Sequence, residues 1–192
     1  MSVTNLDEIL GEFDDLAYRV EKATRPAAQA AAQVFYDEAR LNVSRLNKWT
    51  ARTPGNRQPG VLQDAIYQTF SKDNSGANLA TYHVSWNHKK APHGHLLEYG
   101  HMQPYEYYID KRGFFHTKVR PSMLADYLKF YRNKAVPKHL RDKYFIRLPV
   151  PKQIPAYPFI RPAMAKAQQA YDRATKIILE AVNGERADAR MS

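Results

Sequence analysis

The stretch APHGHLLEYGHMQ, residues 91–103, brings three histidines, one glutamate and two glycines together within thirteen positions. This density of polar and flexible residues allows three interpretations. Imidazoles and a carboxylate are metal ligands, a carboxylate among apolar neighbours is typical of an acid–base catalyst, and glycines are typical of a turn with a fixed backbone. The rest of the chain decides between them.

The metal interpretation needs three or four ligands that converge on one ion. His93 and His95 alternate on an extended segment, and Glu98 or His101 would have to complete the set. The chain has no cysteine and no H-E-x-x-H helix to supply further zinc ligands. We therefore expect histidines that form hydrogen bonds or face solvent near a turn, and we expect neither a metal nor a cofactor.

The acid–base interpretation centres on Glu98, whose neighbours Leu97 and Tyr99 favour partial burial and a shifted pKa. The sequence has no second carboxylate close by, no nucleophile elbow, no phosphate-binding loop and no dinucleotide fingerprint. A buried glutamate without such groups more often bonds to backbone amides or to a cation, for which Arg161 and Lys90 are candidates. The sequence therefore does not predict an enzyme.

Composition predicts a single globular domain over residues 1–192. The chain is long enough for one core, 44% of its residues are hydrophobic, and no apolar run is long enough to span a membrane. The absence of cysteine fits a reducing cytoplasm. The acidic, polar start MSVTNLDEILGEFDD is unlike a signal peptide.

The net charge of +10 is unevenly placed, with −2 in residues 1–48, +11 in residues 49–161 and +1 in residues 162–192. A basic middle segment is typical of a protein that meets a polyanion such as DNA, or an acidic protein partner. Its Lys and Arg residues alternate with aromatic ones, which also fits strands with buried aromatic faces and solvated charges. Sequence-nonspecific nucleic-acid binding is therefore the alternative function. The candidates for contact with DNA or a partner are Lys89, Lys90, Lys111, Arg112, Lys118 and Arg120.

Hydrophobic periodicity predicts helices at both ends of the chain. Residues 1–48 are expected to form two helices, the second of which begins near Pro26. Residues 162–184 are expected to form the C-terminal helix, with Pro162 in its first turn and Gly184 as its stop.

Alternating patterns predict the sheet between these helices, within residues 60–120. One hairpin is expected to turn at residues 73–78 and a second at Lys111–Gly113. An insertion with its own helix is expected over residues 121–147, and a further strand is expected over 143–151. The expected fold is α+β, with a small, curved, mostly antiparallel β-sheet packed with N-terminal and C-terminal helices and a helical insertion.

Three motifs follow one another along the chain. They are G-x-L-x-x-A-I (Gly60, Leu62, Ala65, Ile66), H-x-L-E-Y-G (His95, Leu97, Glu98, Tyr99, Gly100) and P-A-x-P-F-I-R-P-A (Pro155, Ala156, Pro158, Phe159, Ile160, Arg161, Pro162, Ala163). Over about residues 26–183, this combination resembles the siphophage neck family of tail-component or tail-completion proteins. The acidic first helix and the 121–147 insertion depart from the shorter members of that family.

The resemblance implies a structural virion protein of the head–tail junction of a tailed phage, and not an enzyme. It implies a homo-oligomeric ring, sixfold or matched to a twelvefold connector. The implied neighbours are the head-completion or connector protein on one side and the tail terminator or tail tube protein on the other, with passing DNA as a further contact and no membrane. The implied location is the neck of the virion, after synthesis in the host cytoplasm.

The second and third motifs then predict a structural clasp between two distant segments. Glu98 is expected to accept backbone N–H groups or to pair with Arg161, which would tie its segment to the start of the last helix. Leu97 and Tyr99 are expected to pack that segment onto the sheet, and Phe159 to fill the core. The glycine permits a tight turn, and the prolines stiffen the start of the helix. The full set is His95, Leu97, Glu98, Tyr99, Gly100, Pro158, Phe159, Arg161 and Pro162.

Overall fold

The computed structural model describes residues 4–46, 60–111, 115–132 and 134–188. Its helical elements are α1 (Thr4–Arg45), α3 (Val61–Ala65), α4 (Gly94–Tyr99), η1 (Pro121–Met123), α5 (Leu124–Phe130), η2 (Lys138–Leu140), α6 (Arg141–Tyr144), η3 (Arg161–Lys166) and α7 (Ala167–Asp188). Its strands are β1 (Ile66–Gly76), β2 (Leu79–Trp86), β3 (His101–Tyr105), β4 (Tyr107–Ile109), β5 (Phe115–Thr117) and β6 (Arg147–Ile154). Helices and antiparallel strands thus occur together, and the predicted α+β class is confirmed.

The N-terminal region is one helix of 42 residues, and the predicted break near Pro26 is wrong. A proline inside a helix removes one N–H donor and disfavours the helix there. Buried side chains flank it on both sides, since Ala23 and Ala27 are almost fully enclosed while Pro26 itself is exposed. The hydroxyl of Thr24 donates a hydrogen bond of 2.8 Å to the Val20 carbonyl within the same stretch. Packing on both sides of the proline therefore outweighs its local cost.

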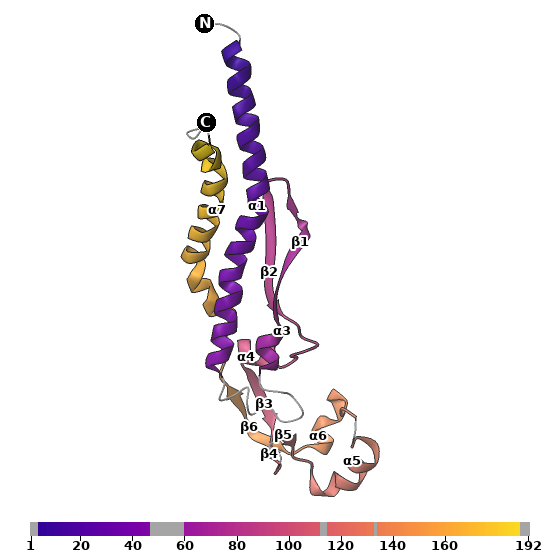
Figure 1. Ribbon diagram of the computed structural model, residues 1–192. Helices are drawn as coiled ribbons and strands as arrows, with labels where there is room; N and C mark the ends of the chain where they lie inside the picture. Colours follow the sequence, from indigo (N-terminus) through magenta and orange to yellow (C-terminus); the bar gives the residue numbers. More distant parts are fainter. Residues whose placement is uncertain (1–3, 47–59, 112–114, 133, 189–192) are drawn as a thin grey trace.

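The body of the molecule consists of α1 with α7 along one side and the β1–β2 hairpin along the other (Figure 1). The two long helices run antiparallel, so the C-terminal half of the chain returns toward its start. The predicted stop at Gly184 is wrong, because α7 continues to Asp188. A glycine inside a helix costs only about 1 kcal/mol relative to alanine, which does not end a helix that is already packed. The main core cluster lies at the lower end of the body and comprises Ala39, Val43, Leu62, Ala65, Ile66, Ala91, Phe159 and Ala163.

The strands of the described residues form three separate two-stranded antiparallel sheets, where the sequence analysis expects a single one. The first predicted hairpin is confirmed as β1–β2, although its first residues form α3 instead of strand. Its turn is shorter than the predicted 73–78, because β1 continues to Gly76 and pairs there with Leu79. The second is confirmed as β4–β5. The third sheet pairs β3 with the distant β6. Proline lacks the N–H that a central strand needs, and Pro104, Pro149 and Pro151 lie in these two strands, which favours an isolated pair.

The predicted insertion forms most of a lobe at the end of the molecule opposite the N-terminus (Figure 1). We call residues 107–147 the distal lobe. Its predicted helix is confirmed as α5, whereas the strand expected from 143 begins only at Arg147, because α6 occupies Arg141–Tyr144. Aromatic rings hold the lobe together, with centroids 5.1 Å apart for Tyr131 and Tyr144. None of the described helices is apolar over enough of its length to cross a membrane.

Candidate functional site

Glu98 lies at the centre of the predicted clasp and is the one charged residue buried in the described part of the chain, with 1% of its surface exposed. The short helix α4 carries it to the lower end of the body. Gly94 begins that helix directly against Trp86, whose ring meets the Phe159 ring edge-on at a centroid distance of 5.5 Å. A methyl group on Gly94 would come within 2.4 Å of the Trp86 ring. Close packing of the helix start therefore sets the position of the carboxylate.

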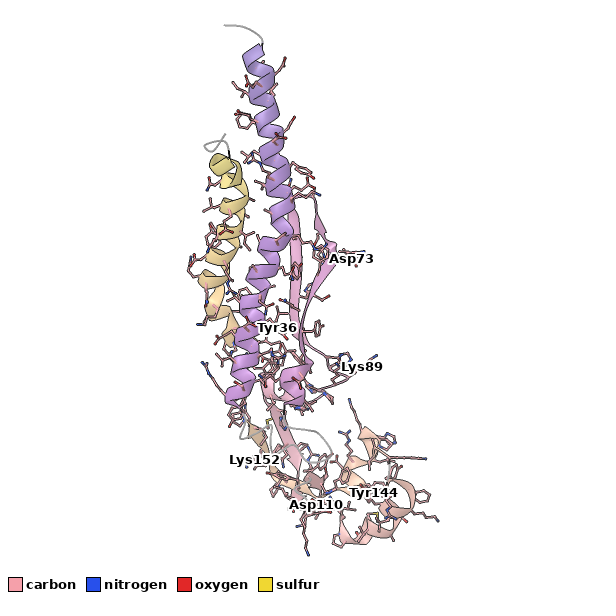
Figure 2. The ribbon with its side chains drawn as sticks, in the orientation of Figure 1. Tyr36, Asp73, Lys89, Asp110, Tyr144 and Lys152 are labelled. Carbon is pink, nitrogen blue, oxygen red and sulfur yellow. The ribbon has the colours of Figure 1, made fainter. Side chains whose placement is uncertain are left out.

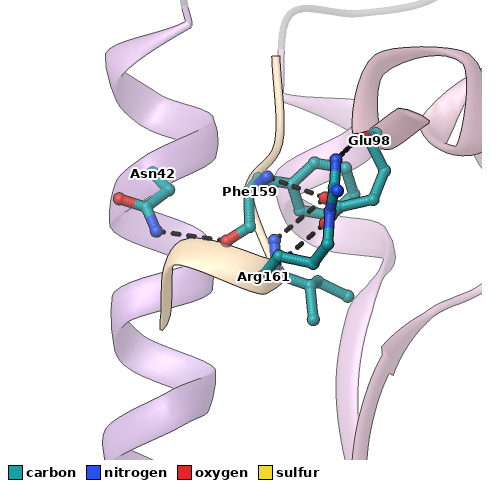
Figure 3. A network of polar contacts seen from close by, with 5 residues as sticks. Asn42, Glu98, Phe159 and Arg161 are labelled. Atoms are coloured by element: carbon teal, nitrogen blue, oxygen red, sulfur yellow. Dashed lines mark hydrogen bonds and ion pairs between the residues drawn. The ribbon is translucent and has the colours of Figure 1, made fainter. Parts of the chain in front are cut away.

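The segment before α7 supplies donors to both oxygens of the Glu98 carboxylate (Figure 3). The backbone N–H groups of Phe159 and Ile160 donate to Oε2 over 2.7 and 3.0 Å. The Arg161 backbone N–H and its Nε donate to Oε1 over 3.0 and 3.1 Å. The Nη2 of Arg161 also donates to the backbone carbonyl of Glu98. The predicted contact between the two motifs is thus confirmed, through backbone amides and the arginine together.

The same contacts fix the charge state of the carboxylate. Burial by itself raises the pKa of Glu98, since a charged group loses its hydration. The backbone donors of Phe159, Ile160 and Arg161, together with the Arg161 side chain, outweigh burial and hold the pKa below its usual value. The carboxylate therefore stays ionised at neutral pH. Its two oxygens already accept four hydrogen bonds from Phe159, Ile160 and Arg161, so the carboxylate links α4 to the segment before α7.

Backbone pairing extends the clasp on either side of Glu98. The Tyr157 N–H donates to the Leu97 carbonyl over 2.7 Å. Beyond Gly100, the β3–β6 ladder begins with His101 opposite Ile154. Gly100 has φ of 70°, and a Cβ there would lie 2.7 Å from the Ile154 carbonyl oxygen. The predicted tight turn is confirmed, and it needs glycine both for its backbone conformation and for the close approach of the two segments.

Phe159 fills the core as predicted, with none of its surface exposed. Its backbone carbonyl accepts a hydrogen bond of 3.1 Å from the Asn42 side chain, so α1 also holds this segment (Figure 3). Pro158 precedes it and is partly buried, and Pro162 occupies the first turn of η3. The clasp therefore joins three parts of the chain: α1, α4 and the start of the C-terminal helical region.

Two of the predicted clasp residues lie outside the packed centre. Tyr99 is 67% exposed, so the expectation that it packs onto the sheet is wrong. Its position follows from α4, where Glu98 points into the core and the next residue points outward. The Arg161 guanidinium lies over the Tyr99 ring at 5.1 Å. His95 is also exposed, whereas Leu97 packs against the core cluster as expected.

The histidines of the opening stretch do not converge on a metal position. Among the described residues, no three His, Asp or Glu side chains lie close enough together to hold an ion. His95 is exposed, and His101 is partly buried in β3, facing Ile154 of β6.

The predicted basic contact residues do not form one patch. Lys89 and Lys90 lie in the exposed turn after β2, where Figure 2 labels Lys89 beside the body. Lys111, Lys118 and Arg120 are exposed in the distal lobe. The predicted contact residue Arg112 lies outside the described residues.

Two of the lobe's cations have partners within the chain. The Lys118 ammonium pairs with Glu106 at 3.0 Å, and the Arg120 side chain donates to the Phe145 carbonyl over 3.1 Å.

Asn42, Trp86 and Gly94 each hold the clasp in place, and none of the three was predicted from the sequence. Asn42 is a polar residue next to buried Val43 on an otherwise apolar helix face, and this was the available signal. Trp86 at the end of a predicted strand gave no hint of its contact with Gly94, because the two are brought together by a turn whose path depends on the core.

Comparison of the chain with protein-family models, with curated proteins and with solved structures finds no match in any of the three. The clasp and the overall architecture are therefore the basis for inferring function.

Proposed function

We propose that this chain is a structural protein of the head–tail junction of a tailed phage, where copies form a ring between the head-completion or connector protein and the tail terminator or tail tube. The observation that carries this proposal is the Glu98 clasp. It joins two of the three motifs on which the resemblance to neck proteins rests, and it uses the carboxylate to hold the fold together. A carboxylate saturated with internal donors suits a scaffold that must keep its shape under load.

The shape of the molecule also supports an assembly role. A long helix extends beyond the body at one end and a separate lobe lies at the other (Figure 1). Large apolar side chains are exposed at both ends, including Phe13 and Leu128. Exposed apolar side chains gathered on one helix are typical of surfaces that another protein covers.

The test is to place the chain in a virion. Deleting its gene from the phage genome that encodes it should leave filled heads and separate tails, which electron microscopy of the lysate distinguishes from complete particles. Restoring a copy with an epitope tag should allow antibody–gold to label the neck. Complete infectious particles without the gene, or label away from the neck, would contradict the proposal.

Sequence-nonspecific nucleic-acid binding remains the second candidate, and the distal lobe is the observation that favours it. Residues 107–147 carry eleven Lys and Arg against three Asp, a net charge of +8. A surface of this kind neutralises phosphates without reading bases. Fluorescence anisotropy with two unrelated duplexes should then give equal affinities that fall steeply with salt. Affinity that differs between the duplexes, or no binding at low salt, would exclude it.

A further inference from the structure

The first part of α1 projects beyond the other described elements: its side chains from Leu6 to Asp15 are exposed, and Leu16, Arg19 and Val20 after them are partly buried. Figure 1 shows α1 running past the end of α7 and past the β1–β2 hairpin. We call residues 4–22 the acidic arm. Its large apolar side chains follow the i, i+3, i+4, i+7 spacing of a single helix face and are 47–63% exposed: Leu6, Ile9, Leu10 and Phe13.

This exposed face is the continuation of the face that packs α1 into the body. Steps of seven residues lead from Phe13 through Val20 to Ala27 and Val34, and the last two are buried. Within the body the face is covered by the rest of the chain; in the arm the same pattern of apolar side chains meets water. A face built for packing that lacks an intramolecular partner is suited to a partner from another molecule.

The charge of the arm restricts what that partner is. The arm contains six Asp and Glu residues against two Lys and Arg, a net charge of −4. The acidic residues occupy the other faces of the helix: Asp7, Glu8, Glu12, Asp14, Asp15 and Glu21. Two such arms repel each other, so a contact between arms of two copies is disfavoured. The matching surface is basic, with exposed apolar side chains at its centre.

The distal lobe of the same chain has these properties. Its net charge is +8, and the exposed apolar side chains on and near α5 are 46–54% accessible: Leu124, Leu128 and Phe130. Tyr127 and Tyr131 are partly buried and contact Tyr144, whereas Leu124, Leu128 and Phe130 stay exposed. In the described part of the lobe, no carboxylate pairs with Lys129, Arg132 or Lys134, which lie on α5 or just after it.

We propose that the acidic arm of one copy docks onto the distal lobe of a second copy of this chain. The apolar face around Phe13 would cover Leu124 and Leu128, and the acidic residues would face the unpaired cations. Because arm and lobe lie at opposite ends of the molecule, the contact joins two different surfaces. Such contacts form rings when the rotation between copies closes, open filaments when it does not, and a reciprocal pair when two copies lie antiparallel. The proposal deepens the ring proposed above, on which its biological meaning rests.

A charge-exchange series with the full-length chain tests this docking. Reversing the arm (Glu12→Lys, Asp14→Lys, Asp15→Lys) and reversing the lobe (Lys129→Glu, Arg132→Glu, Lys134→Glu) should each raise the dissociation constant of self-association about tenfold or more, measured by sedimentation velocity over a concentration series. Combining both reversals in one chain should bring it back to within about threefold of the original, since the charges match again. Reversing Lys89 and Lys90 is the matched control and should change nothing.

An apolar series separates this contact from docking elsewhere on the body. Leu10→Gln with Phe13→Gln should abolish association, while Tyr171→Gln, an equally exposed aromatic on α7, should leave it intact. Circular dichroism confirms that each variant is folded.

Three outcomes would overturn the proposal. The first is a chain that stays monomeric at every concentration. The second is association that is weakened by Tyr171→Gln but not by the arm variants, and the third is a lobe reversal that removes binding to duplex DNA but leaves self-association unchanged.

These measurements use the purified chain, so their outcome does not depend on whether the proposed function is correct. Copies that associate through arm and lobe but are missing from the neck would refute the function and leave the contact standing. If the chain is found at the neck but neither charge reversal changes the dissociation constant of self-association, only the proposed contact is refuted.

Discussion

At the scale of single residues, Glu98 shows how a buried charge can be tolerated. Removing a carboxylate from water is costly unless hydrogen bonds and an opposite charge replace its hydration. Here three backbone N–H groups and the Arg161 guanidinium do so, with donor distances of 2.7–3.1 Å. Because the arginine is half exposed, the backbone donors are the part of the network that solvent screens least.

Substituting Glu98→Gln should lower the free energy of unfolding by about 3 kcal/mol. Glutamine replaces one carboxylate oxygen, which accepts hydrogen bonds, by an amide nitrogen, which donates them. That nitrogen would face the backbone N–H of Phe159 or of Arg161 and leave it without an acceptor. Urea unfolding followed by circular dichroism measures the loss. Glu180→Gln is the control, since its carboxylate lies exposed on α7 beside Lys176 and should contribute little. A loss below about 1 kcal/mol would show that the network does not hold the fold.

The clasp should also make stability depend on pH in the acid range. The folded-state pKa of Glu98 lies below the unfolded-state value, so its contribution is present above the unfolded pKa and is lost as pH falls through the folded one. The difference in unfolding free energy between the natural chain and Glu98→Gln should therefore narrow between about pH 5 and pH 2. Chemical unfolding at several pH values measures it. A difference that stays constant would mean that the carboxylate does not titrate with unfolding.

Gly100→Ala should destabilise the fold by about 2–3 kcal/mol, because a left-handed backbone strains the new side chain and its Cβ meets the Ile154 carbonyl. Gly76→Ala is the matched control. It lies in β1 with open space around it and should change stability by less than about 0.5 kcal/mol. Thermal unfolding of both variants at one protein concentration measures the two changes in stability. Equal losses of stability would argue against a special role for the turn at Gly100.

At the scale of elements, the sequence predicted those helices and strands that depend on neighbouring residues. It did not predict the features that depend on packing between distant parts of the chain. The two hairpins and the helix in 121–133 follow from alternation, turn residues and helical spacing, all of which are local. The continuity of α1 through Pro26 depends on partners that lie far along the chain. The Glu98 contact was predictable because a buried carboxylate needs donors, whereas the roles of Asn42 and Gly94 depend on where α1 and Trp86 lie in space.

Pro26→Ala should raise the free energy of unfolding by about 2 kcal/mol, since α1 already has a helical backbone there and gains an N–H donor. Urea titration measures the change. A decrease would instead show that the proline fixes a bend on which the packing of α1 depends.

At the scale of the whole molecule, stability and association use different parts of one helix. The lower part of α1 packs into the core through Ala39 and Val43, while the arm exposes side chains of the same kind to solvent. The chain thus has a packed body between an acidic end and a basic end, which are the two surfaces of the proposed contact.

Phe13→Ala and Val43→Ala, on the same helix, should behave differently. At concentrations where the chain is monomeric, Phe13→Ala should change the free energy of unfolding by less than about 0.5 kcal/mol, as for other exposed positions. Val43→Ala should cost about 2 kcal/mol because it leaves a cavity in the core. Denaturant unfolding of dilute samples compares them. A large loss for Phe13→Ala under these conditions would mean that the arm packs against its own body.

The separation of the clasp's two halves has a consequence for synthesis. Glu98 and the Phe159 amide are 61 positions apart, so at about 5–20 residues per second a ribosome delivers the carboxylate roughly 3–12 s before its first donor. During that interval the side chain stays hydrated, and the core around Phe159 remains open. The core of a nascent chain is therefore completed only after translation has passed Phe159, when most of the polypeptide has been made.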